Sequence, residues 1–141
     1  MPDPPVPDPH LHGYKGLVGG SLGEIEHAIL LEQYGGKDLA AEVAPHWRGS
    51  SFELLENRKA ARVVLLYAAE WDSEDAARRY FAAYRGMMGK KWRAMSVTAE
   101  SADSVTGTGD DGAFELRRTG AIVTSMEGLD PAGRQTAGAI H

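Results

Sequence analysis

The 141-residue sequence contains no cysteine, no long apolar segment and no excess of basic side chains. Without cysteine the chain cannot form disulfides, zinc-thiolate sites or a thiol nucleophile. Its longest apolar run, residues 63–69, is far shorter than the roughly 20 residues that span a bilayer. Fifteen basic and 20 acidic side chains give a net charge of −5. Nucleic acid or an anionic membrane would need a basic face, so we expect neither as a partner.

The composition is that of a globular protein, with 43% apolar and 25% charged residues, and the length fits one soluble domain. Five of the seven prolines fall within residues 1–20. Proline-rich segments are stiff and extended, so this stretch is predicted to be an arm or linker that contributes little to stability. We expect a single domain over residues 21–128 and a short C-terminal helix or tail over residues 129–141.

The order of helical and strand patterns predicts an α+β fold. The motif SLGE at residues 21–24 resembles a capping box, with Ser21 as the N-cap of a first helix that buries Leu22, Ile25 and Ile29. A short second helix is expected over 38–44, before Pro45. Two strands, at 51–56 and 61–71, then form a hairpin. The second of these is apolar on both sides, which indicates an interior position in the sheet.

A long amphipathic helix is predicted over residues 72–88, because acidic and capping residues precede apolar positions at helical spacing. Tyr80, Phe81, Tyr84 and Met88 should face the sheet. After the helix the apolar period falls to two, which predicts an antiparallel meander. Its strands are expected at 92–99, 103–108, 113–118 and 121–127. All strands together should form a single sheet with the helices packed on it.

Two short motifs resemble catalytic or cofactor signatures. Residues 19–23 (GGSLG) match the nucleophile elbow G-x-S-x-G, but that motif needs a preceding central strand, and Ser21 already has a role as a helix cap. Residues 107–112 (GTGDDG) match G-x-G-x-x-G, but a strand rather than a helix follows, and two aspartates would repel phosphate. We therefore expect no catalytic residue and no cofactor-binding residue from either motif.

The candidate metal ligands are few. His10 and His12 lie on one side of an extended segment, and Glu24 and His27 are three residues apart on the first predicted helix. Both spacings suit a transition metal, yet the HExxH motif is absent and the E-x-x-H pair occurs once. Solvent-exposed histidines are the favoured interpretation. The tryptophans at 47, 71 and 92 are expected to fill the core, although they could also line a ligand groove.

Three stretches together resemble the C-terminal region of a group of uncharacterised bacterial proteins predicted to be zinc peptidases of the HExxH type. They are residues 20–24 (GSLGE), 47–49 (WRG) and 71–76 (WDSEDA), and residues 126–128 (MEG) fit the end of the same region. In that family the metal site lies in an upstream part that this sequence does not include, so no catalytic residue carries over. The resemblance implies an accessory region attached to an enzyme, and an extracytoplasmic location.

Three hypotheses about function follow. The first is a non-catalytic accessory or interaction domain that packs on its own parent enzyme or on another protein chain. The second is a free-standing domain that binds a small ligand in a pocket between the sheet and the helix of Tyr80 and Tyr84. The third is a metal-dependent hydrolase built from the histidines. An exposed apolar patch would favour the first, an aromatic-lined cavity the second, and a bound metal with three protein ligands the third. The sequence leaves the oligomeric state open.

Overall fold

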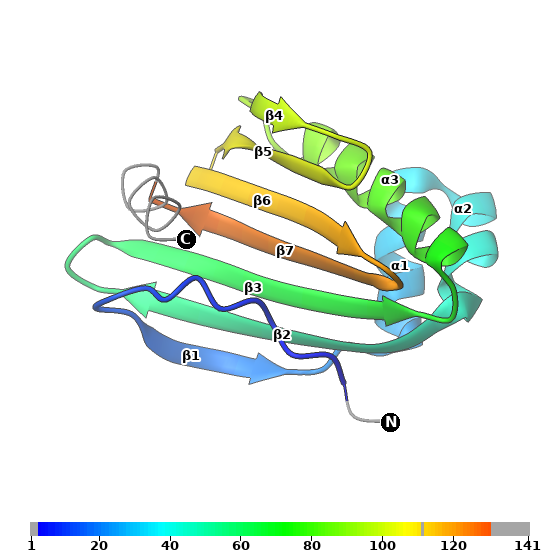
Figure 1. The fold of residues 1–141 in the computed structure, drawn as a ribbon, viewed down its shortest axis with the longest axis horizontal. Helices are drawn as coiled ribbons and strands as arrows, with labels where there is room; N and C mark the ends of the chain where they lie inside the picture. Colours follow the sequence, from blue (N-terminus) through cyan, green and yellow to red (C-terminus); the bar gives the residue numbers. More distant parts are fainter. Residues whose placement is uncertain (1–2, 111, 131–141) are drawn as a thin grey trace.

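A computed structural model describes residues 3–110 and 112–130 of the chain (Figure 1). The predicted α+β fold is confirmed, since three helices pack on one antiparallel sheet of seven strands. The elements in chain order are β1 (Lys15–Gly20), α1 (Glu24–Gly35), α2 (Lys37–Val43), the short 3-10 helix η1 (Ala44–His46), β2 (Trp47–Asn57), β3 (Arg62–Trp71), α3 (Glu74–Lys91), β4 (Ser96–Glu100), β5 (Ser104–Gly109), β6 (Gly112–Thr119) and β7 (Ile122–Leu129). The C-terminal helix expected within residues 129–141 falls almost wholly outside the described residues.

The strands lie in the order β1-β2-β3-β7-β6-β5-β4, and every neighbouring pair is antiparallel. Strand β3 is interior, as its apolar sequence predicted, because it pairs with both β2 and β7. The last strand therefore returns to the middle of the sheet, between β3 and β6. This arrangement aligns Glu127 of β7 with Leu65 of β3 and with Phe114 of β6.

One face of the sheet carries the helices, which gather toward the end where β2 begins and β3 ends (Figure 1). Side chains alternate along a strand, so Tyr67 and Trp71 of β3 share this face while Val64 and Leu66 point to the other. The larger core cluster lies here and joins Trp71 to Tyr80, Phe81 and Met88 of α3. The candidate site described below is built on this face.

The N-terminal segment covers the opposite face. In Figure 1 it runs across β2 and β3 before it turns into β1. Pro4 and Pro9 are buried. A second core cluster on this face consists of the buried residues Val64, Leu66, Ala113 and Leu129. Five partly buried hydrophobic residues pack against it: Val6, Leu11 and Tyr14 from the N-terminal segment, and Leu55 and Met126 from the sheet. The segment is thus a cover for the sheet rather than a free arm.

Residues 15–20 also differ from the expected arm, because they form the edge strand β1. Proline lacks a backbone N–H and so needs no partner for it, which lets an extended proline-rich segment lie across strands without adding to the sheet. The glycines and the pair Leu17-Val18 that follow have no such restriction and pair with β2. Sequence composition alone does not separate these two outcomes.

Helix α1 begins later than the capping motif predicted. Its N-cap is Gly23, without a side-chain cap, so the prediction for Ser21 is wrong. The reason is a tertiary contact: the buried Ser50 hydroxyl accepts a hydrogen bond from the Leu22 backbone N–H at 3.2 Å and donates one to the Leu22 carbonyl. Both backbone groups of Leu22 are held by β2, and the helix starts at Glu24.

The buried face of α1 is also different from the predicted one. Ile25 and Ile29 are 73% and 60% exposed, while His27 and Leu31 are buried. Leu22, which lies before the helix, packs partly against the core as expected. Apolar side chains occupy most positions between 25 and 31, so periodicity does not single out one face. The contacts of His27 with the sheet decide the orientation.

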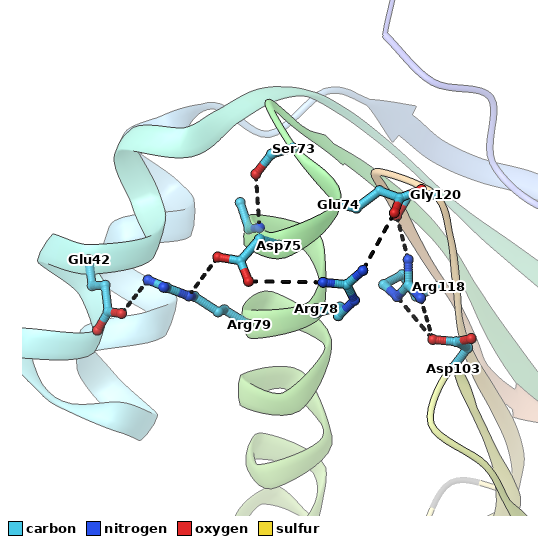
Figure 2. Close-up of polar contacts among 10 residues, drawn as sticks. Glu42, Ser73, Glu74, Asp75, Arg78, Arg79, Asp103, Arg118 and Gly120 are labelled. Atoms are coloured by element: carbon cyan, nitrogen blue, oxygen red, sulfur yellow. Dashed lines mark hydrogen bonds and ion pairs between the residues drawn. The ribbon is translucent and has the colours of Figure 1, made fainter.

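Helix α3 matches its prediction closely. The Ser73 hydroxyl caps it by accepting from the Ala76 N–H at 3.1 Å, and Tyr80, Phe81 and Met88 are buried. Its solvent side carries ion pairs drawn in Figure 2, where Arg78 meets Glu74 and Asp75, and Arg79 links Asp75 to Glu42 of α2. The same view shows Arg118 of β6, which pairs with Asp103 and donates to the Gly120 carbonyl. The helix continues to Lys91, which delays the first strand of the meander to Ser96.

Candidate functional site

His27 lies at the centre of a buried hydrogen-bonded chain on the helix face of the sheet. Its Nδ1 is 2.8 Å from the Gly23 carbonyl oxygen, and its Nε2 is 2.5 Å from the Tyr67 hydroxyl. A carbonyl oxygen only accepts, so Nδ1 carries the hydrogen and donates it. Burial lowers the pKa of His27, which keeps the ring neutral and leaves Nε2 as an acceptor. Tyr67 therefore donates to His27.

The chain extends to helix α3 through Tyr80, whose hydroxyl is 2.7 Å from that of Tyr67. Tyr67 gives its only hydrogen to His27, so Tyr80 must donate to Tyr67. The direction of every bond is thereby determined, from α3 through β3 to α1. Burial raises the pKa of both phenols, which stay protonated and act as donors rather than as bases.

Two tryptophans border His27. The ring centroid of Trp71 lies 5.8 Å from that of His27 in an edge-on arrangement, and the centroid of Trp47 lies 6.3 Å away. Both indoles belong to or pack against the core, as the sequence predicted. Their buried Nε1 atoms have no hydrogen-bond partner in the described part of the chain. Each unpaired donor has a cost in stability, so the two indoles contribute to this part of the core through packing rather than through hydrogen bonds.

A second polar cluster surrounds Glu127 of β7, which is only 5% exposed. The Tyr84 hydroxyl donates to Oε2, the Ser125 hydroxyl donates to the same oxygen at 2.6 Å, and the Lys91 ammonium lies 3.2 Å from Oε1. Three donors from two elements thus satisfy this buried carboxylate. The pKa of Tyr84 is raised well above its usual value, first by burial and then by the negative charge of Glu127.

The two clusters meet at a pair of stacked rings, Tyr67 and Tyr84, whose centroids are 5.8 Å apart at an interplanar angle of 20°. Beside these rings lies a pocket of about 240 Å³. It lies where α1, β2, β3 and α3 meet, and most of its wall is apolar or aromatic. The lining residues are Leu22, Glu26, His27, Leu30, Phe52, Leu65, Tyr67, Tyr84 and Lys91. The exposed members of this set are the charged side chains of Glu26 and Lys91.

Of the four metal-ligand candidates from the sequence, the structure brings only His27 into the core. His10 and His12 are exposed on the N-terminal segment, where His10 lies 3.5 Å from Asp8, and Glu24 is exposed at the start of α1. Within residues 3–110 and 112–130, no group of three His, Asp or Glu side chains is placed to hold a metal ion. Both ring nitrogens of His27 already have partners.

Neither of the two sequence motifs lies in the structural context that its signature requires. Gly107 and Gly109 lie in strand β5, and Gly109 pairs with Gly112, the first residue of strand β6. The Asp110 carboxylate accepts from the backbone N–H groups of Arg93 and Ala94, and these bonds lower its pKa. Ser21 is exposed and follows β1, which is an edge strand instead of the central one that a nucleophile elbow needs.

Sequence reasoning missed Tyr67, Lys91 and Glu127 as members of a site. Tyr67 is hidden inside an apolar run, and Lys91 lies beyond the predicted end of its helix. Glu127 carried a usable signal, because Ser125 and Glu127 alternate with apolar or neutral residues on a strand whose Val123 is buried. Two polar residues on the same side of a strand as a buried residue indicate buried polar groups that need hydrogen-bond partners.

Comparison with known families gives one result. A family described as a domain of unknown function (DUF8575) matches residues 15–137, which includes every element around the pocket. The chain belongs to this family. Comparison with curated proteins and with solved structures gives no match. Nothing in the family description links it to zinc peptidases. Among the helices that the structure describes, none is long and apolar enough to cross a membrane.

Proposed function

We propose that this domain binds a small, mainly apolar molecule in the pocket beside Tyr67 and Tyr84. The observation that carries the proposal is the pocket itself, an apolar and aromatic cavity with two charged side chains among its lining residues. Binding sites for small molecules typically combine such walls with a few polar groups that orient the ligand. Its volume of about 240 Å³ lies just below the range of roughly 300–1,000 Å³ for drug-sized ligands. The ligand is accordingly about the size of a single substituted ring.

The polar groups around the pocket support a preformed site. Tyr67 is held by hydrogen bonds to His27 and Tyr80, and Tyr84 is held by Glu127. A ligand that contacts these rings breaks none of these bonds. Side chains already held in position lose little entropy on binding, which favours affinity.

The proposal is tested by titrating the protein with indole and following backbone amide signals by NMR. We expect saturable shifts centred on Leu65, Tyr67 and Tyr84. Leu30→Trp, which places a larger side chain in the pocket, should abolish them. Ile29→Trp is the matched control, because Ile29 is the next residue of α1 but is 60% exposed on its outer side. Shifts that do not saturate, or that persist in Leu30→Trp, would exclude the pocket as the site.

A second candidate function is the accessory or interaction domain, and a separate observation favours it. Ile25 and Ile29 lie one turn apart on the outer side of α1 and are largely exposed, and Leu17 and Val18 are about half exposed on the edge strand β1. Exposed apolar groups of this kind are common where proteins associate. The resemblance of residues 20–24, 47–49 and 71–76 to a region attached to predicted zinc peptidases supports the same idea. Sedimentation velocity of the protein and of the double variant Ile25→Ser/Ile29→Ser would test it, with concentration-dependent association expected only for the unmodified chain.

A further inference from the structure

The charges around the pocket narrow the class of ligand. We propose that the ligand is a small amine whose apolar or aromatic body fills the pocket and whose ammonium group binds to Glu26. This inference rests on the proposed function, because it assigns the ligand of the same pocket. It follows from the balance of charges among Glu26 and Lys91, which line the pocket, and Glu127, which bonds to Lys91.

Lys91 and Glu127 compensate each other. The ammonium of Lys91 lies 3.2 Å from the buried carboxylate of Glu127 and 5.5 Å from the centre of the Trp92 ring. Both contacts direct the ammonium toward β7 and the end of α3. The ammonium keeps further N–H donors, but its charge is already balanced by the carboxylate of Glu127. Lys91 therefore adds little net positive charge to attract an anion.

Glu26 is the other charged side chain that lines the pocket. It lies in the first turn of α1 and lines the pocket, and no ion pair to it is formed within the described residues. Its Oε2 lies near Gly23, the N-cap of the helix. Glu26 is also close enough to His27 to raise its pKa against the effect of burial. A carboxylate without an ion-pair partner among the described residues thus borders the apolar pocket.

The other polar atoms of the wall offer little to an anion. The nitrogens of His27 and the hydroxyl of Tyr67 are committed to partners, and Tyr84 donates to Glu127. An anionic ligand would be repelled by Glu26, and the positive charge of Lys91 is already balanced by Glu127. A neutral ligand would gain only apolar contacts. A cationic ligand gains those contacts and an ion pair with Glu26, so it is the class that this wall selects.

Three probes of similar shape test the inference: benzylamine, benzyl alcohol and phenylacetate, each titrated by NMR at low ionic strength. We expect benzylamine to bind about fivefold more tightly than benzyl alcohol, as one partly exposed ion pair allows. Phenylacetate should bind most weakly. The preference for benzylamine should shrink as salt is added, because salt screens exposed charges.

Glu26→Gln should remove the difference between benzylamine and benzyl alcohol. Glu24→Gln is the matched control, because Glu24 is an exposed acidic residue of the same helical turn that does not line the pocket. Equal binding of the three probes, tightest binding of phenylacetate, or an unchanged preference in Glu26→Gln would overturn the inference while the pocket still bound ligands. Failure of all three probes, together with failure of indole, would overturn the proposed function as well.

Discussion

The two faces of the sheet are built in different ways. The helix face buries polar side chains, namely His27, Tyr67, Tyr80 and Glu127, and connects them by hydrogen bonds in fixed directions. The opposite face is an apolar cluster under the N-terminal segment. A single strand serves both, since Leu65 and Tyr67 point to one face while Val64 and Leu66 point to the other.

The two faces therefore contribute differently to the stability of the fold and to the precise placement of its side chains. Burying apolar side chains stabilises a fold in proportion to area and tolerates changes of shape, whereas a buried polar group is tolerated only with correctly placed partners. The helix face therefore holds its side chains in one arrangement, which suits a binding pocket. The face under the N-terminal segment needs only to be covered.

The largest effect is expected on the helix face. Phe81 is 7% exposed in the contact between α3 and the sheet, so Phe81→Ala should lower the free energy of unfolding by about 3–5 kcal/mol. Arg78→Ala, on the exposed side of the same helix, should cost less than about 0.5 kcal/mol. Urea denaturation of both variants measures the difference. Equal costs would show that the buried side of α3 has been assigned wrongly.

The N-terminal cover should matter more than its proline-rich sequence suggests. Deleting residues 1–13 would expose Val64 and Leu66, which are 0% and 3% exposed. Burial of each aliphatic side chain is worth roughly 1.5–3 kcal/mol, and the entropy of ordering the segment offsets part of it. We expect a net loss of about 2–3 kcal/mol by chemical denaturation. His12→Ala is the control, and a loss below about 1 kcal/mol on deletion would restore the interpretation as a free arm.

The polar network predicts a pH dependence that the apolar face cannot produce. Burial holds the pKa of His27 in the folded state below its usual value of about 6.5. As the pH falls below about 6.5, the unfolded chain takes up a proton that the folded chain does not, so stability decreases with a slope of at most about 1.4 kcal/mol per pH unit. Between pH 7.5 and 5, the free energy of unfolding from chemical denaturation should fall more steeply with decreasing pH for the unmodified protein than for His27→Gln. Equal slopes would contradict the buried neutral histidine.

The smallest effect is expected on the outer side of α1. Ile25 is 73% exposed, so Ile25→Ser should change the free energy of unfolding by less than about 0.5 kcal/mol. Leu31→Ala, at a position with no exposure in the same helix, should cost about 2–5 kcal/mol. Thermal melts of the two variants distinguish the observed face from the one expected from the sequence. A large loss for Ile25→Ser would favour the original prediction.

Errors in the sequence prediction occur where a distant contact overrides a local signal. Ser21 and Glu24 have the spacing of a capping box, yet Ser50 of β2, 28 residues from Leu22, moves the helix start. In α1 the apolar pattern leaves the buried face open, and Tyr67 selects it through His27, 40 residues away. In contrast, Ser73 caps α3 through Ala76, only three residues away, so the start of this helix lies close to the predicted one.

What the sequence by itself determined is the order of helices and strands after residue 20, including α3 with its buried Tyr80 and Phe81 and the hairpins of the meander. These depend on hydrogen bonds and side-chain periodicity within a few residues, so the local sequence contains the necessary information. Only the tertiary structure decided the site. The return of β7 to the middle of the sheet brings Glu127 to Tyr84 and Lys91, 43 and 36 residues away in the chain. No local pattern encodes such a pairing, because it depends on which strands become neighbours when the whole sheet forms.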